Sequence, residues 1–270
     1  MAFTETFGSE EDYKDASPEE LRLYYASKAS VIPHHNTPTV PPAISKIYKQ
    51  NAAQYGWLSV MAVSEYQGML QNFVIGLIGA KKILEIGLFT GASAIFFATG
   101  LARNGVAGQP DSNGYRPVIS LEVSEEYATV ARKNFADANV EDYIDVMVGD
   151  AHESLAKLTD QKFDLIFIDA DKESYLDYYK TIMDNEMLSK KGLIIADNTA
   201  FDCVTRLINT PVPVENNAPM LDMPESNHSE WKETGKALHE FNEYIRQDPC
   251  VEVVMLPLFT GITFIRLLSS

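Results

Sequence analysis

The sequence is poor in cysteine and in basic residues, and each shortage excludes a class of protein. It holds two cysteines, Cys203 and Cys250, among 270 residues, so it can build neither a disulfide framework nor a four-thiolate zinc site. Lysine and arginine number 22 against 38 acidic residues, and the formal net charge is -16. A field of that sign repels nucleic acids and anionic membranes, so we expect neither as a partner.

Long apolar runs and targeting signals are also missing. The longest uncharged, mainly apolar stretch runs from Ile86 to Ala102, which is shorter than the ~20 residues of a membrane span and contains several glycines. The first residues, MAFTETFGSEEDYKD, lack the basic and apolar parts of a secretory signal. With 46% hydrophobic and 22% charged residues, the composition is that of an ordinary globular chain. We therefore expect a cytoplasmic protein without a membrane segment.

The chain divides into a predicted N-terminal arm, residues 1–45, and a predicted single domain, residues 46–270. In the arm, SPEE at 17–20 is typical of a helix start, and the proline-rich segment 33–42 ends any helix that follows. A second helical region is expected from about 45 to 78.

From Lys81 onward, short apolar runs alternate with amphipathic segments in five successive units. Each unit joins a strand pattern to a helix pattern, as in KKILEIG followed by GASAIFFATGLAR. The alternation is typical of a parallel sheet with helices on both faces. After a last helix, EWKETGKALHEFNEYIRQ, the strands VEVVMLP and GITFIRLL lie close together in sequence and predict a hairpin. We therefore expect an α/β fold whose seven-stranded, mostly parallel sheet ends in an antiparallel hairpin.

The end of the first expected strand carries a glycine turn. Gly87 and Gly91 are four residues apart, so the turn differs from the G-x-G-x-x-G fingerprint of dinucleotide-binding proteins. Glycines there allow a ligand to approach the backbone closely, and the helix N-terminus that follows favours polar or anionic groups. Glu122 ends the second strand, where an acid can accept both hydroxyls of a ribose. A plain strand-to-helix turn and a helix-capping acid are the alternative interpretations.

Two acidic clusters follow the fourth and fifth expected strands. Asp169-Ala170-Asp171-Lys172 comes after the fourth, and Asp197-Asn198 comes after the fifth. If these strands are neighbours, the clusters meet at one edge of the sheet. The carboxylates of Asp169 and Asp197 and the amide oxygen of Asn198 are hard ligands that suit Mg²⁺ or Mn²⁺ better than zinc. Two helix-capping acids are the alternative.

Four segments of the chain resemble one enzyme family. Together, ILEIGLFTGASA, the acidic ISLE, FDLIFIDADKESY and GLIIADNT resemble the cation-dependent, S-adenosylmethionine-dependent O-methyltransferases. These include the caffeoyl-CoA O-methyltransferase-like enzymes and, more distantly, catechol O-methyltransferase. The resemblance covers about Val60 to Leu267 and implies a Rossmann-like methyltransferase fold, a homodimer, S-adenosylmethionine and Mg²⁺ or Mn²⁺. It also implies methyl transfer to a hydroxyl of a catechol-like or other vicinal-diol phenol.

The resemblance assigns roles to individual residues as well. It implies that Lys172 is the general base and that Asp169, Asp197 and Asn198 bind the cation. Asp169 and Asp202 would also contact the acceptor. A salt bridge to Asp169 or Asp171 is the alternative role for Lys172. The cofactor contacts would come from Val63, Glu85, Gly87, Leu88, Ser93, Glu122, Ala151 and Asp171.

The chain departs from the family at the C-terminal hairpin. The family commonly has P-x-G-D-G there, whereas this chain has Pro257-Leu258-Phe259-Thr260-Gly261. Because that hairpin borders the acceptor site in the family, the acyl-CoA acceptor of the plant enzymes does not carry over.

Three other functions match parts of the sequence. FDLIFIDAD ends an apolar strand with D-x-D, as in haloacid-dehalogenase-like phosphatases, but Glu173 stands where those enzymes have Thr or Val. A nicotinamide-dependent oxidoreductase would need the absent G-x-G-x-x-G. A non-catalytic binding protein could keep the fold, but the complete set of metal ligands and Lys172 argue against lost activity.

Overall fold

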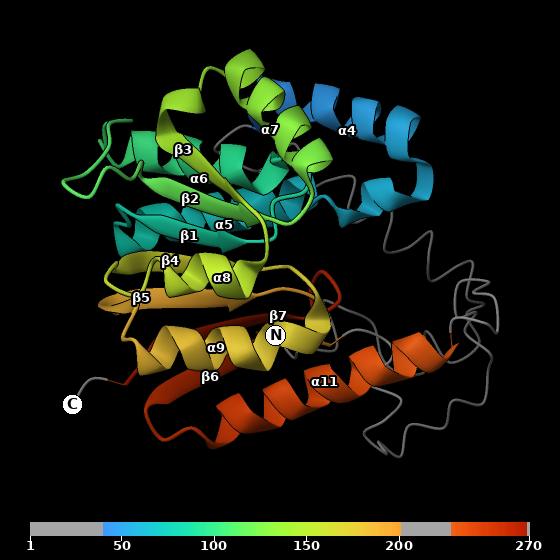
Figure 1. Ribbon diagram of the computed structural model, residues 1–270, viewed down its shortest axis with the longest axis vertical. Helices are drawn as coiled ribbons and strands as arrows, with labels where there is room; N and C mark the ends of the chain where they lie inside the picture. The colour runs from blue at the N-terminus through green and yellow to red at the C-terminus, as the bar shows by residue number, and fades with distance from the viewer. Residues whose placement is uncertain (1–39, 201–227, 269–270) are drawn as a thin grey trace, which may run out of the picture. The chain divides into compact units, whose positions relative to one another are not determined.

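A seven-stranded sheet forms the centre of the computed structural model, which describes residues 40–200 and 228–268 (Figure 1). The strand order is β3-β2-β1-β4-β5-β7-β6. Strands β1 to β5 pair in parallel, and β7 is antiparallel to both β5 and β6. This confirms the predicted architecture. The strands are β1 (Ile83–Ile86), β2 (Val118–Glu122), β3 (Ile144–Val148), β4 (Phe163–Ile168), β5 (Leu188–Ala196), β6 (Val251–Leu256) and β7 (Ile262–Leu267).

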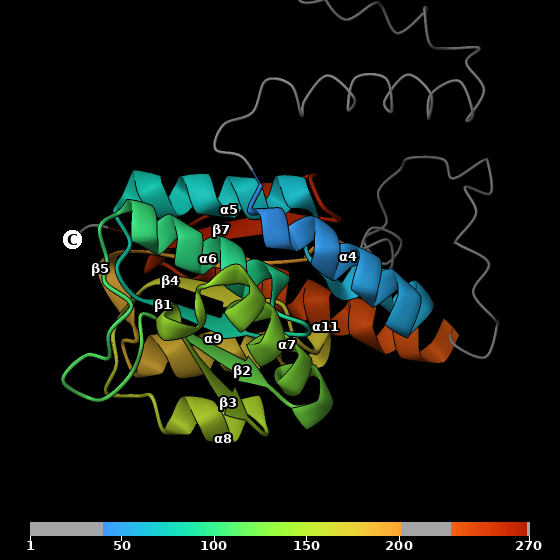
Figure 2. The same ribbon diagram turned by 90° about the horizontal axis from the view of Figure 1, so that it is seen from above.

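Helices cover both faces of the sheet, as Figure 2 shows from a second direction. One apolar cluster packs α4, α5, α6 and α7 on one face, and a second packs α8, α9 and α11 on the other. Strand β1 is buried on both sides, and its side chains alternate between the two clusters. The helices are α4 (Pro42–Tyr55), η2 (Gly56–Met61), α5 (Glu65–Ile78), α6 (Ala92–Arg103), α7 (Glu125–Ala138), η3 (Glu141–Tyr143), α8 (Ala151–Ala156), η4 (Lys172–Ser174), α9 (Tyr175–Asp184) and α11 (His228–Gln247).

The helical region expected from 45 to 78 is divided into three elements, so that expectation was too coarse. Gly56 ends α4 with a φ of 58°, a value that favours glycine. A new helix then starts at Ser64, whose hydroxyl accepts a hydrogen bond from the backbone N–H of Gln67. Gly79, at a φ of 65°, ends α5 in the left-handed conformation. The break matters because it brings Val63 and the first turn of α5 into the interior.

The register of the central strands places their carboxyl ends at one edge. Ile86 of β1 pairs with Ile168 of β4, and Ile168 pairs with Ala196 of β5. The residues that follow these strands therefore meet, as expected for ligand sites in parallel sheets.

Several predicted features lie outside the described residues. They are the helix of the N-terminal arm, the helix expected after the fifth strand, Asp202 and Cys203. The predicted boundary near residue 45 stays a prediction. Among the described residues, no helix is long and apolar enough to cross a membrane.

Candidate active site

The glycine turn after β1 closes tightly against the end of β4. Gly87 and Gly91 have φ values of 97° and 85°. A Cβ on Gly87 would collide with the carbonyl oxygen of Asp169, and one on Gly91 would collide with the ring of Phe135. Both positions therefore need glycine for conformation and for space.

Residues outside the turn hold its central part in place. Phe89 has a φ of 51°, which is unusual for an aromatic residue. Its ring packs against the rings of Tyr55 and Tyr127, with centroids 5.5 and 4.8 Å away. Nδ2 of Asn134 donates to the Thr90 carbonyl oxygen at 2.9 Å. These contacts hold the turn in its conformation.

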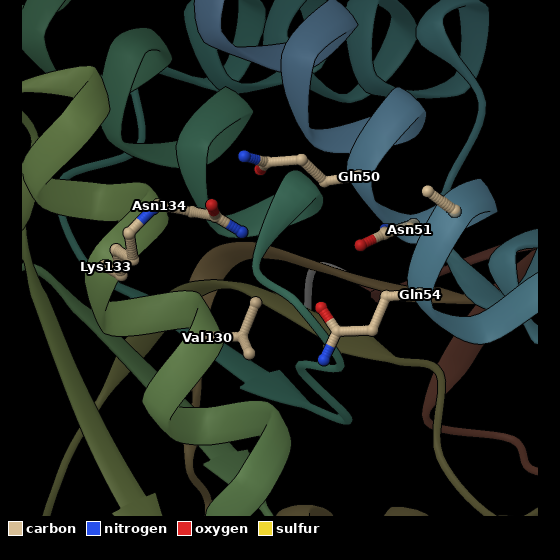
Figure 3. Close-up of a pocket in the computed structure, with 7 residues that line it drawn as sticks. Gln50, Asn51, Gln54, Val130, Lys133 and Asn134 are labelled. Atoms are coloured by element: carbon tan, nitrogen blue, oxygen red, sulfur yellow. The ribbon is translucent and has the colours of Figure 1, made fainter.

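A groove lies between α4 and α7, next to this turn (Figure 3). Nδ2 of Asn51, on its wall, donates to the Thr90 hydroxyl at 2.8 Å. None of the predicted site residues within 40–200 lines the groove, so the candidate site lies elsewhere. The groove is lined by Gln50, Asn51, Ala53, Gln54, Val130, Lys133 and Asn134.

Two carboxylates support the turn from within the sheet. Glu85 is fully buried, and the hydroxyls of Ser93 and Ser120 donate to its two oxygens. Burial raises the pKa of Glu85 to about 8, against the lowering effect of those two hydrogen bonds. The structure therefore puts Glu85 and Ser93, two predicted cofactor contacts, in one hydrogen-bonded unit.

Glu122 binds the backbone of the turn. Its Oε2 accepts the N–H groups of Leu88 and Phe89, at 3.3 and 2.7 Å, and its Oε1 accepts the N–H of Ser124 at 2.9 Å. A carboxylate offers about four acceptor positions, so one remains for a ligand hydroxyl. Glu122 therefore has a structural role in the turn, and its predicted contact with a ribose stays a prediction.

The burial of Glu85 predicts a pH-dependent stability. Between about pH 4.5 and pH 8 the folded state holds a proton on Glu85 that the unfolded state has released. Stability from this group therefore falls as pH rises through that window, by a few kcal/mol in order of magnitude. Glu85→Gln, which cannot ionise, is expected to flatten this part of the profile. Urea unfolding of the ligand-free wild type and variant at pH 5.5 and 8.5 would measure the difference, and parallel profiles would contradict it.

The two acidic clusters lie side by side at the ends of β4 and β5. The Asp169 N–H donates to the Ile86 carbonyl at 2.8 Å, and the Asp197 N–H donates to the Ile168 carbonyl at 3.0 Å. Asp197 is 4% exposed, and its pKa is raised to about 7, first by burial and then by the charge of Asp169. Two neighbouring carboxylates at this edge create the negative potential that a cation would offset.

The residues present suit a divalent cation with oxygen ligands. Among residues 40–200 and 228–268, no group of three or more His, Cys, Asp or Glu is placed to hold a metal. Asp169 and Asp197 would therefore need a neutral third ligand, and the amide oxygen of Asn198 is next in sequence. Asn198 has a φ of 56°, and its own N–H donates to Asp197 Oδ1 at 2.8 Å. Oxygen donors without sulfur or imidazole favour Mg²⁺ or Mn²⁺.

Lys172 lies beside this pair of carboxylates. Its Nζ donates to Asp169 Oδ1 at 2.9 Å and to the hydroxyl of Tyr175 at 2.7 Å. Tyr175 is fully buried, and its hydroxyl is shared between the carbonyl oxygens of Ile168 and Asp197, each at 3.1 Å. Burial raises the pKa of Tyr175 well above its usual value, so it stays a donor to the ends of both strands. The ion pair with Asp169 that was the alternative for Lys172 is thus present in the structure.

Sequence analysis missed Gln67 and Gln71, one turn apart on α5. Both are buried. The Gln67 side chain lies close enough to Asp197 to lower its pKa by hydrogen bonding, although Nε2 has no partner of regular geometry among the described residues. The signal in the sequence was the pair of amides, four residues apart, on an otherwise apolar helix face.

Three predicted cofactor residues, Val63, Ala151 and Asp171, lie outside the turn itself. Val63 is buried, and its carbonyl oxygen accepts the Tyr48 hydroxyl at 2.5 Å. Ala151 is the first residue of α8. Asp171 is exposed and accepts the hydroxyl of Tyr178 at 2.7 Å. Their predicted cofactor contacts stay predictions.

Comparison with known proteins points in one direction. Residues 37–268 match a family model described as O-methyltransferase. The chain is 32% identical over 232 residues to caffeoyl-CoA O-methyltransferase 1 of Eucalyptus globulus, covering 84% of this chain and 83% of that protein. It is 30% identical over 190 residues to O-methyltransferase hkm8 of Aspergillus hancockii, covering 68% and 71%.

Solved structures give the same result. The fold is similar to that of the SAH-bound methyltransferase PaMTH1 of Podospora anserina, with a TM-score of 0.74, 27% identity and coverage of 91% of this chain and 96% of that chain. It is also similar to an O-methyltransferase of Bacillus cereus in complex with SAH, with a TM-score of 0.67, 26% identity and coverage of 88% and 96%.

Proposed function

The chain belongs to the O-methyltransferase family and is an S-adenosylmethionine-dependent O-methyltransferase, and from this premise we propose that it requires a divalent cation and methylates a vicinal-diol phenol. One observation carries the proposal. Asp169 and Asp197 follow adjacent strands, with Asn198 next to them and Lys172 beside them. A site for the cofactor's sulfonium group and a site for a chelating acceptor would then share one edge of the sheet.

The cofactor would lie over the turn after β1. Gly87 and Gly91 allow the positive φ values of this tight turn, and Glu122 keeps one acceptor position for a ribose hydroxyl. The match to the O-methyltransferase family argues against the two rival enzyme classes, a phosphohydrolase and a nicotinamide-dependent oxidoreductase.

Asp169, Asp197 and Asn198 would hold the cation, which when bound lowers the pKa of a coordinated phenol from its usual value of about 10. Lys172 is proposed as the group that receives the phenolic proton on Nζ. Asp169 and Tyr175 both accept hydrogen bonds from Nζ, so Lys172 lies beside one of the proposed cation ligands.

The transfer itself is an in-line displacement. The phenolate oxygen would form a bond to the methyl carbon while the carbon–sulfur bond breaks, its electron pair staying on sulfur, and S-adenosylhomocysteine would leave. Much of the rate acceleration would come from holding the two reactants in line. Charge is neutralised along the reaction, so a buried site favours it.

Chelation is expected to abolish the reaction. Purified protein with S-adenosylmethionine and a panel of catechols and caffeoyl-type phenols should add one methyl mass in the presence of Mg²⁺. EDTA should lower the rate of product formation by at least about 100-fold, because loss of the Lewis acid costs several kcal/mol of transition-state stabilisation. Excess Mg²⁺ should restore the rate. Mass spectrometry of each reaction is the measurement.

A matched acceptor keeps the two parts of the proposal apart. Phenols with a single hydroxyl cannot chelate and should react at least about 10-fold more slowly than their ortho-diol counterparts, since chelation supplies orientation. Methylation that survives EDTA would contradict cation dependence. Equal rates for mono- and dihydroxy phenols would contradict the diol acceptor while leaving the cation in place.

A homodimer and a cytoplasmic location are part of the same proposal, and the homodimer rests on the family resemblance. Light scattering of the full chain would give the mass in solution, with twice the monomer's 30.1 kDa expected. A monomer that retains full activity would refute the dimer without touching the chemistry.

A further inference from the structure

The hairpin between β6 and β7 makes an unusual turn at the edge of the candidate cation site. The Gly261 N–H donates to the Leu258 carbonyl at 2.9 Å, and Phe259 and Thr260 between them have φ values of 54° and 62°. Positive φ at both central positions is the mark of type I′ turns, which prefer Asn-Gly. Threonine is β-branched and disfavours this conformation, so Thr260 is a strained choice. Strain kept at a candidate site calls for a functional reason.

Backbone hydrogen bonds join the turn to the segment that follows β5. The Thr199 N–H donates to the Gly261 carbonyl at 2.9 Å, and the Ala200 N–H donates to the Thr260 carbonyl at 3.0 Å. A Cβ on Gly261 would collide with the backbone of Ala200, so the two segments are in close contact. Thr260 is therefore held at a defined position next to Asn198.

The hydroxyl of Thr260 fixes which end of the Asn198 amide faces the hairpin. The hydroxyl is in close contact with the Phe259 carbonyl oxygen, to which it can donate its single hydrogen. Toward Asn198 it can then only accept, and it accepts from Nδ2 at 2.7 Å. The amide nitrogen of Asn198 therefore faces the hairpin, and the amide oxygen lies on the other side of the planar group.

We propose that Thr260 is a positioning residue, which holds the Asn198 side chain so that its oxygen, not its nitrogen, is offered to the cation. The inference rests on the proposed cation site and deepens it. An amide NH₂ cannot ligate a metal ion, so an amide free to flip would spend part of its time in a form that does not bind. Groups that orient metal ligands typically contribute 10- to 100-fold to metal affinity. Thr260 thus performs a task at the position where the family commonly has Asp.

Mn²⁺ binding to the full chain tests this without any catalytic readout. Free Mn²⁺ is followed by electron paramagnetic resonance, in the absence of S-adenosylmethionine and acceptor. Thr260→Val removes the hydroxyl while keeping the branched shape, and it is expected to weaken Mn²⁺ binding by about 10-fold. Thr260→Ser keeps the hydroxyl and should bind within about twofold of wild type. Wild-type affinity in Thr260→Val would overturn the proposal.

A glycine variant separates positioning from folding. Thr260→Gly also removes the hydroxyl, but it relieves the strain of a positive φ, so its melting temperature should equal or exceed that of wild type. Its Mn²⁺ affinity should nevertheless fall as far as that of Thr260→Val. A melting temperature and an affinity that fall together in both variants would mean that the turn only stabilises the fold, and would refute the positioning role.

Asp197→Ala distinguishes failure of this inference from failure of the cation site itself. If it abolishes binding while Thr260→Val binds normally, the cation site stands and the role of Thr260 is refuted. If wild type binds Mn²⁺ no better than Asp197→Ala, the cation site and the role of Thr260 are both refuted.

Discussion

Replacing Asp169 by alanine is expected to abolish methyl transfer while the protein stays folded. The carboxylate is one of the two acidic oxygen donors at the ends of β4 and β5, and it is the anionic partner of Lys172 at 2.9 Å. Its loss removes a proposed metal ligand and releases the proposed base. We expect kcat/KM to fall by at least about 10³-fold, which corresponds to several kcal/mol of transition-state stabilisation.

The change in stability should be small because two effects oppose each other. Removing Asp169 breaks the ion pair with Lys172, which is destabilising. It also removes the neighbouring charge that raises the pKa of Asp197, which is stabilising. We expect a net change within about 1 kcal/mol. Steady-state kinetics and thermal unfolding of the same preparation would measure both quantities.

A matched variant checks that the effect belongs to this position. Asp184→Ala removes an exposed carboxylate at the end of α9 and should leave kcat/KM within about twofold of wild type. Turnover by Asp169→Ala close to that of Asp184→Ala would refute the assignment of Asp169 to the cation site.

Replacing Gly87 by alanine is expected to be the most destabilising single change in the glycine turn after β1. The φ of 97° is strained for alanine, and the new Cβ would collide with the carbonyl oxygen of Asp169. That oxygen belongs to backbone at the end of β4 and cannot swing away as a flexible side chain would. We expect a loss of about 3 kcal/mol or more in the free energy of unfolding, measured by urea titration.

Gly79→Ala is a control that introduces the backbone strain of a positive φ without a steric collision. Gly79 also has a positive φ, 65°, but a Cβ there would meet no atom within 4 Å. The expected loss is about 1 kcal/mol, from backbone strain alone. Equal losses in the two variants would show that the contact between the turn and the end of β4 does not matter. A folded Gly87→Ala protein that binds S-adenosylmethionine as wild type would refute the proposed cofactor turn.

The sequence alone was enough for the fold and for naming the residues proposed at the strand ends. Five apolar runs alternate with amphipathic helices, and a parallel sheet buried on both faces needs that alternation. Asp169, Asp197 and Asn198 could be named because ligand sites in such sheets follow the strand ends, and strand ends are visible in the pattern. The glycines of the turn could be named for a similar reason, since a chain that reverses this sharply has few other residues to use.

What sequence analysis missed depends on segments that are distant in the chain. Gln67 reaches Asp197 only because helix α5 packs over the sheet, and the break at 56–64 decides which face of α5 points inward. The expectation of one helical region from about 45 to 78 did not include that break, after which Ser64 acts as the N-cap of α5.

The amino-acid pattern by itself determined the architecture, the strand-end carboxylates and the glycine turn, since each follows from local periodicity or from a residue's own conformational limits. Only the tertiary structure decided how these groups are oriented. The ion pair of Lys172 with Asp169, the three backbone contacts of Glu122 and the hydrogen bond from Asn198 to Thr260, 62 residues away, are products of packing. A hydrogen bond is set by distances of tenths of an ångström, and those are fixed when helices and hairpins dock, not when they form.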